Sequence, residues 1–205
     1  MCVELGAEDA YETFLTLSFS DRLTEAYQCL KVAAEQGVEA AQLQFALYQI
    51  EGKNNQRKEH CGDEADRDDD VLLEKSLNSL LSSQSTESVA IAHLVKARML
   101  SSDGAPFASY ERHLTEAAIR GNFQAMYDLH NRSAESECSS SYFWGAAILA
   151  APTTNSSSLA AKQLREKLTE LSLDNAAEDA AKDFWILDVD SRRNQLREFL
   201  QRFRC

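Results

Sequence analysis

The sequence predicts an all-α protein, a right-handed α-solenoid of about four antiparallel helix pairs with a capping helix at each end. Three observations lead to this prediction. Only 7 Gly and 2 Pro occur in 205 residues, which leaves few residues for the tight turns of a β fold. Apolar residues recur at three- and four-residue steps along most of the chain. One segment with paired alanines and a glycine occurs twice, as in repeat architectures.

The repeat is clearest in residues 33–41 and 117–125. Both segments read Ala-Ala, two residues, Gly, three residues, Ala, with the glycines at Gly37 and Gly121. Glycine adopts the left-handed conformation that ends a helix at little cost, so each glycine is expected to separate two helices. Helices joined by so short a turn are expected to pack antiparallel.

The other elements follow in order along the chain. An amphipathic helix over 8–19 is expected to cap the array at its N-terminal end. A weaker helix pair is expected over 71–81 and 89–100, where leucines and alanines stand at helical spacing. The C-terminal part is expected to hold helices over 142–151, 159–171, 172–185 and 191–203.

These elements divide the chain into three parts: a capping helix over 1–19, a repeat domain over 20–187 and a C-terminal helix over 188–205. The repeat domain contains one stretch without periodicity, residues 53–69, where a basic run precedes a cluster of acidic residues. Such a composition is typical of solvated segments, so we expect a disordered acidic insertion there.

The charge of the chain is strongly negative. Its 33 acidic residues against 21 basic ones give a formal net charge of −12. Because such a surface repels phosphates and anionic lipids, nucleic acid and membranes are disfavoured as partners, and a basic protein is slightly favoured. No run approaches the ~20 apolar residues that a membrane-spanning helix needs.

The chain has five cysteines at irregular spacing: Cys2, Cys29, Cys61, Cys138 and Cys205. An odd number without regular spacing argues against a disulfide framework and is compatible with reduced thiols in a cytoplasm. The N-terminal residues show no basic region followed by an apolar run, so we expect a cytoplasmic protein. A periplasmic location is the alternative if a leader has been removed.

Motifs for catalysis or cofactor binding are not found, and we expect neither an enzyme nor a cofactor. Asp66, Asp68 and Asp70 alternate as in a calcium loop. However, Val71 stands where that loop needs Gly, and Leu77 stands where it needs a bidentate Glu. We therefore expect no metal site; an enzyme that uses this acidic stretch as a metal loop is the less favoured alternative.

The repeated segments resemble the Sel-one-like repeats, which are relatives of the tetratricopeptide repeat. That family's core reads roughly Ala-Ala, two residues, Gly, three residues, Ala, three residues, Leu, with a Gly after the second helix. The matching positions are Ala33, Ala34, Gly37, Ala41, Phe45 and Gly52 in one unit and Ala117, Ala118, Gly121, Ala125 and Leu129 in the other. Phe45 replaces the family's Leu, and the later unit lacks the last Gly. The resemblance covers about residues 20–187 apart from the insertion.

Three consecutive aromatic residues, Tyr142, Phe143 and Trp144, precede paired alanines, and a later Trp185 resembles the closing helix of that family's last unit. A helix cannot bury three successive side chains on one face. Core packing between repeats is the favoured interpretation of these aromatic side chains, and a contact with a partner is the alternative.

The resemblance implies a non-enzymatic protein–protein interaction module. Stacked helix pairs form a concave surface lined by the first helix of each pair. From the periodicity and the aromatic run, the expected partner-binding residues are Tyr27, Lys31, Glu111, Arg112, Tyr142 and Trp144. Among the roles that the resemblance implies, our hypothesis is a bacterial immunity protein that neutralises a secreted toxin, such as a type VI secretion effector. A scaffold or adaptor subunit of a bacterial signalling or envelope assembly is the alternative.

Overall fold

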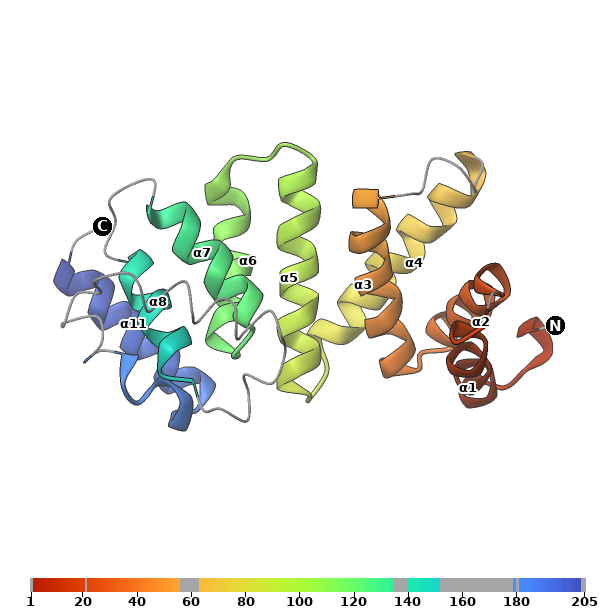
Figure 1. The fold of residues 1–205 in the computed structure, drawn as a ribbon, viewed down its shortest axis with the longest axis horizontal. Coiled ribbons are helices and arrows are strands. Elements are labelled where there is room, and N and C mark those ends of the chain that lie inside the picture. Colours follow the sequence, from red (N-terminus) through yellow and green to blue (C-terminus); the bar gives the residue numbers. More distant parts are fainter. Residues whose placement is uncertain are drawn as a thin grey trace. The chain divides into compact units, whose positions relative to one another are not determined.

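The computed structural model describes residues 2–20, 22–55, 63–134, 140–151, 179 and 181–203. Within these residues all regular structure is helical, which confirms the all-α prediction (Figure 1). The chain divides into two compact units, Met1–Asp103 and Gly104–Cys205, called here the first and second unit. The repeat domain that the sequence predicts over 20–187 includes parts of both units and stays a prediction.

The first unit is a series of helices in which each packs against the next. Its elements are η1 (Cys2–Glu4), α1 (Ala7–Ser18), α2 (Leu23–Glu35), α3 (Glu39–Asn55), α4 (Asp63–Leu81) and α5 (Thr86–Ser102). Contacts join α1 to α2, α2 to α3, α3 to α4 and α4 to α5, and α5 also contacts α3. Small alanines and the larger Phe45, Leu30 and Leu77 fill the core between these helices.

The second unit contains α6 (Phe107–Ile119), α7 (Phe123–Ala134), α8 (Ser140–Leu149), η4 (Phe184–Ile186) and α11 (Val189–Phe203). Helix α7 packs against α6 and α8, and α11 contacts both α6 and α8. The helix predicted over 159–171, and nearly all of the one predicted over 172–185, lie outside the described residues. Across the described part of the chain, no helix is both long and apolar enough to span a bilayer.

The two predicted repeats end their first helices in the same way. Gly37 and Gly121 have φ angles of 89° and 91°, in the left-handed region, as predicted. The amide after each glycine donates to a carbonyl five residues earlier, at 3.1 Å in both cases, and each glycine N–H donates to a carbonyl three residues earlier. These two bonds form a Schellman motif, which satisfies carbonyls at the helix end.

The two glycines differ in what a side chain would meet. A Cβ added at Gly37 has open space, whereas one at Gly121 would lie 3.2 Å from Cζ3 of Trp185. We expect Gly37→Ala to lower the free energy of unfolding by about 1 kcal/mol through backbone strain alone. Gly121→Ala should cost about 1 kcal/mol more because Trp185 must also shift. Urea unfolding of both variants measures the difference; equal losses would contradict the role of the Trp185 contact.

Part of the stretch predicted to be a disordered acidic insertion is helical. The stretch expected to be disordered was 53–69, but α3 continues to Asn55 and α4 begins at Asp63. Only 56–62 of that stretch lies outside the described residues. Asp69 is buried at 4% exposure while its neighbours Asp68 and Asp70 are exposed. The prediction was wrong here because the Asp69 carboxylate points inward and has a partner there. An acidic segment can therefore form a helix that packs against the core.

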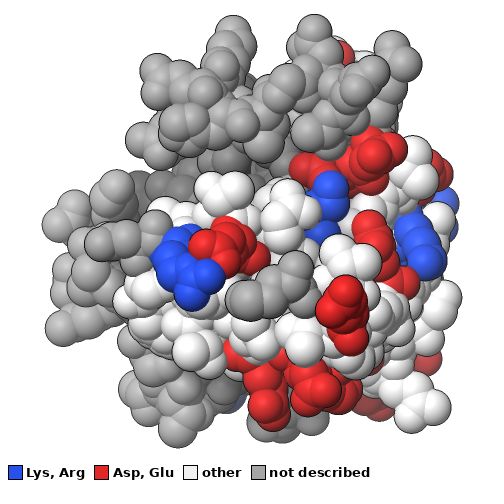
Figure 2. Space-filling model, turned by 90° about the vertical axis from the view of Figure 1, so that its right-hand side faces the viewer, with Lys and Arg blue, Asp and Glu red and all other residues white. Residues whose placement is uncertain are grey.

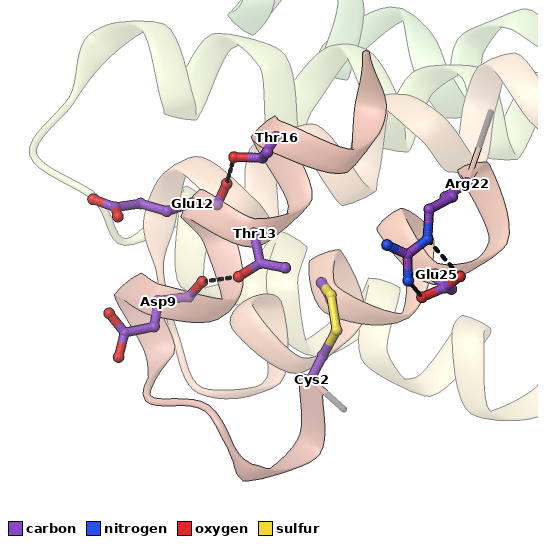
Figure 3. The surroundings of a disulfide bond; sticks show 8 residues. Cys2, Asp9, Glu12, Thr13, Thr16, Arg22 and Glu25 are labelled. Atoms are coloured by element: carbon purple, nitrogen blue, oxygen red, sulfur yellow. Dashed lines mark hydrogen bonds and ion pairs between the residues drawn. A yellow bond between two sulfur atoms is a disulfide. The ribbon is translucent and has the colours of Figure 1, made fainter. Parts of the chain in front are cut away.

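The prediction of reduced thiols is also corrected. Cys2 and Cys29 form a disulfide with a Cα–Cα distance of 5.1 Å (Figure 3). The physical reason is that η1 folds back onto α2 and places Cys2 against the inner face of that helix, where Cys29 is fully buried. Spacing along the sequence could not reveal this contact. Cys61, Cys138 and Cys205 lie outside the described residues.

Candidate protein-binding surface

Tyr27 and Lys31, two of the predicted partner-binding residues, belong to a polar network between α2, α3 and α4. The Tyr27 hydroxyl donates to Asp69 Oδ2 at 2.6 Å and accepts a hydrogen bond from Gln49 Nε2 at 2.7 Å. Lys31 Nζ lies 2.5 Å from Asp69 Oδ1, and the two side chains are 16% and 5% exposed. Tyr27 also stacks on Phe45, with ring centroids 6.0 Å apart. Their principal contacts in this structure are therefore within the protein.

The four predicted residues of the second unit lie in different environments. Glu111 and Arg112 are exposed on α6. Trp144 is 2% exposed and packs edge-to-face on Phe143 and on Phe184. The side chain of Tyr142 lies outside the described residues.

The prediction of Trp144 as a partner contact is therefore corrected in favour of core packing. Phe143 and Trp144 are successive residues, yet both are buried. This is possible because α8 has neighbours on more than one side: α7 and α11 pack against it, and Phe184 lies against both rings. The argument from a single buried helix face does not apply to a helix enclosed in this way.

Arg192 joins the segments of the second unit. Its guanidinium donates to the carbonyl oxygens of Phe184, Ile119 and Trp185 at 2.7, 3.1 and 3.2 Å. It also lies over the Phe184 ring, 4.9 Å from the centroid. Burial lowers the pKa of Arg192, which Asp188 partly offsets, but a guanidinium remains charged. One of its acceptors is the last carbonyl of α6, where a cation is favourable.

Metal-binding chemistry is not evident in the described ranges. No group of three or more His, Cys, Asp or Glu side chains lies close enough there to hold a metal ion. Of the alternating aspartates, Asp68 and Asp70 are exposed on a regular helix, and the side chain of Asp66 is outside the described residues.

The net charge is concentrated in the first unit. Residues 1–103 contain 9 Lys and Arg against 19 Asp and Glu, a formal charge of −10, whereas 12 against 14 give −2 for residues 104–205. On the face shown in Figure 2, acidic side chains cover more of the described surface than basic ones do. The first unit therefore carries most of the negative charge of the chain.

One exposed stripe of α1 combines this charge with apolar side chains. Glu8, Glu12, Leu15 and Phe19 follow each other at four- and three-residue steps, so they share one face; we call this set the α1 stripe. All four are exposed, Leu15 at 42% and Phe19 at 92%. Leu23, at the start of α2, is 61% exposed. The stripe is acidic in its first half and apolar in its second.

The carboxylates of α1 form no ion pair among the residues that the structure describes. No Lys or Arg occurs in residues 1–21, and Glu8, Asp9 and Glu12 form no ion pair within the described structure. In Figure 3 the carboxylates of Asp9 and Glu12 project from α1, whereas Arg22 and Glu25 face each other. The hydrogen bond from Arg22 lowers the pKa of Glu25, so that carboxylate is already paired. The α1 carboxylates remain available to a cation from outside the chain.

Sequence reasoning treated α1 only as a capping helix and therefore missed the α1 stripe. The spacing of residues 8, 12, 15 and 19 could have revealed the α1 stripe from the sequence. A capping helix is expected to turn a polar face to solvent, whereas this face of the helix ends in Leu15 and Phe19. Exposure of Phe19 became evident only from the structure.

Comparison of the chain with protein-family models, curated proteins and solved structures finds no match.

Proposed function

We propose that this chain is a non-enzymatic protein-binding module and that the α1 stripe binds a basic segment of the partner. The observation that carries the proposal is the exposure of Leu15 and Phe19 on the same helix face as Glu8 and Glu12, two carboxylates that form no ion pair among the described residues. Apolar and aromatic side chains supply the energy of an interface, and charges around them supply orientation and association rate.

The stripe indicates the chemistry of the partner. Lysines or arginines of the partner would pair with Glu8 and Glu12, and an apolar residue following them would contact Leu15 and Phe19. A partner segment with a basic half and an apolar half matches this order. The charge of −10 on the first unit would also attract a basic protein before contact is made.

A solenoid architecture for the chain is part of this proposal. Two features support it: the sequential packing of helices within each unit, and the matching Schellman motifs at Gly37 and Gly121. In this interpretation α2–α3 and α6–α7 are two copies of one Sel-one-like repeat, and α1 packs against the first copy with the α1 stripe exposed. A partner helix could pack on that stripe as one repeat packs on the next.

Photocrosslinking tests the binding proposal. A photoreactive phenylalanine analogue is placed at Phe19 and, as a matched control, at Ile186, an apolar residue of the second unit that is 82% exposed. We expect a discrete protein adduct only at position 19, from a basic partner. The adduct should be lost with Glu8→Lys combined with Glu12→Lys. Identical adducts at both positions, or an adduct that survives the charge reversal, would contradict the proposal.

The narrower hypothesis, that this chain is an immunity protein, is tested by identifying the protein that crosslinks at position 19. We propose a secreted toxin as the partner, with a scaffold or adaptor role as the alternative. A partner that inhibits growth when expressed alone and is harmless with this chain would support immunity. The Cys2–Cys29 disulfide favours the periplasmic alternative for such an encounter, because disulfides persist in oxidising compartments.

A further inference from the structure

A groove in the second unit lies between α6 and α11. Its volume is about 340 Å³. The floor is apolar, because it contains Ile119 of α6 and Leu196 of α11, which are 1% and 5% exposed. The half-buried Leu200 also lines the groove, together with Arg193 and Arg197 of the same helix. This groove therefore combines an apolar surface with two guanidinium groups.

Helix α11 carries an excess of positive charge, although the net charge of the chain is −12. Between Val189 and Phe203, four arginines stand against one Asp and one Glu, which gives a formal charge of +2. Arg193 already pairs with Glu116, at 3.0 Å, and with a carboxylate of its own helix. Arg197 is exposed, and its guanidinium donates to the neutral side chain of Asn194 at 2.8 Å. Among the described residues Arg197 forms no ion pair, so its charge can be used by a carboxylate from another molecule.

The spacing of these side chains matches that of the α1 stripe. In the stripe, Glu, Glu and Leu stand at positions 8, 12 and 15. On α11, Arg, Arg and Leu stand at positions 193, 197 and 200, with the same steps of four and three residues. Residues at such steps share one face of a helix. If the two helices pack in parallel in this register, each carboxylate faces a guanidinium and the two leucines meet, which is favourable in both charge and apolar contact.

We propose that the α1 stripe of one copy of this chain binds the groove between α6 and α11 of a second copy. Glu12 pairs with Arg197, Leu15 packs against Leu200, and Phe19 extends the apolar contact by one helical turn. The inference rests on the proposed function, because it uses the α1 stripe as a binding surface for a basic segment. A basic segment of another protein competes with α11 of the second copy for this surface.

The form of the self-association follows from the two surfaces. They are different, so a copy that binds through its stripe still has a groove for another copy, and the association can continue beyond a dimer. The contact involves few residues and depends partly on exposed charges. We therefore expect weak association that becomes weaker as the salt concentration is raised.

Sedimentation velocity of the purified full chain tests this inference. The average mass should increase with protein concentration up to about 1 mM and decrease when salt is added. Glu12→Arg or Arg197→Glu alone should weaken the association about ten-fold. An equimolar mixture of these two variants should associate again, because Glu12 of one variant meets the unchanged Arg197 of the other. Arg202→Glu reverses an exposed arginine of α11 outside the groove lining, and this matched control should associate as the unchanged chain does.

Circular dichroism of each variant checks that the helices are retained. A chain that stays monomeric up to about 1 mM, association that Arg197→Glu leaves unchanged, or variants that do not recover on mixing would overturn the inference. The proposed function stands in each of these cases if crosslinking at position 19 captures a different, basic protein. If the chain neither associates nor forms an adduct at position 19, the α1 stripe is not a binding surface and both proposals fail.

Discussion

Replacing Asp69 by alanine is expected to lower the free energy of unfolding of the first unit by about 3–5 kcal/mol. The reason is that the Lys31 ammonium, whose side chain is only 16% exposed, would lose its counter-charge at 2.5 Å. The Tyr27 hydroxyl would lose its acceptor at the same time. Both Trp residues, 144 and 185, lie in the second unit, so hydrogen–deuterium exchange of α2 to α4 in increasing urea is the appropriate measurement.

Asp70→Ala is the matched control for Asp69→Ala, since Asp70 is the next residue on α4 and is exposed. It should change the free energy of unfolding by less than about 0.5 kcal/mol. The combined variant Lys31→Met with Asp69→Leu should recover most of the loss, because no unpaired charge remains buried. Equal effects of Asp69→Ala and Asp70→Ala would contradict the role given to the network.

Replacing Arg192 by alanine is expected to lower the free energy of unfolding of the second unit by about 3 kcal/mol. Hydrogen bonds from a charged donor each contribute ~1.5–3 kcal/mol, and Arg192 makes three of them to backbone carbonyls. The expected loss is below their sum because the side chain is only half-buried and water can reach part of the site. Tryptophan fluorescence during urea unfolding measures it directly, since Trp185 is one of the contacts.

Arg197→Ala on the same helix controls for the general loss of an arginine. Its guanidinium is exposed, and its hydrogen bond to Asn194 is on the surface. We expect a change below about 0.5 kcal/mol. If Arg192→Ala changed the free energy of unfolding as little as Arg197→Ala does, the hydrogen bonds of Arg192 would not be needed to hold α11. The helix would then be held by its apolar face alone, through Leu196 and Phe199. Arg192→Lys should recover little, because an ammonium cannot reach three carbonyls in different directions.

Local sequence patterns predicted well the helices that lie in the described residues. The alanine pairs, the spacing of leucines and the two glycines depend on interactions within about five residues, and the structure confirms left-handed glycines at 37 and 121. Such short-range preferences can be recognised directly from sequence. The same reasoning placed helices over 8–19 and 191–203 to within a few residues of α1 and α11.

Contacts between distant residues could not be predicted in this way. The Cys2–Cys29 disulfide, the Asp69–Lys31 pair across 38 positions and the bond from Arg192 to the Ile119 carbonyl all depend on how helices meet. The sequence analysis therefore expected free thiols, an acidic disordered stretch up to residue 69 and exposed roles for Tyr27 and Lys31. Charge and polarity alone indicate exposure, but a specific partner allows a polar side chain to be buried.

The amino-acid sequence by itself determined that this chain is helical, acidic and built around two Ala-Ala-Gly segments, because these properties depend on composition and local spacing. Only the tertiary structure decided which side chains have partners and which do not. It buried Trp144, enclosed Asp69 and left Phe19 exposed. These outcomes depend on the packing of helices far apart in sequence, whose geometry no local pattern specifies.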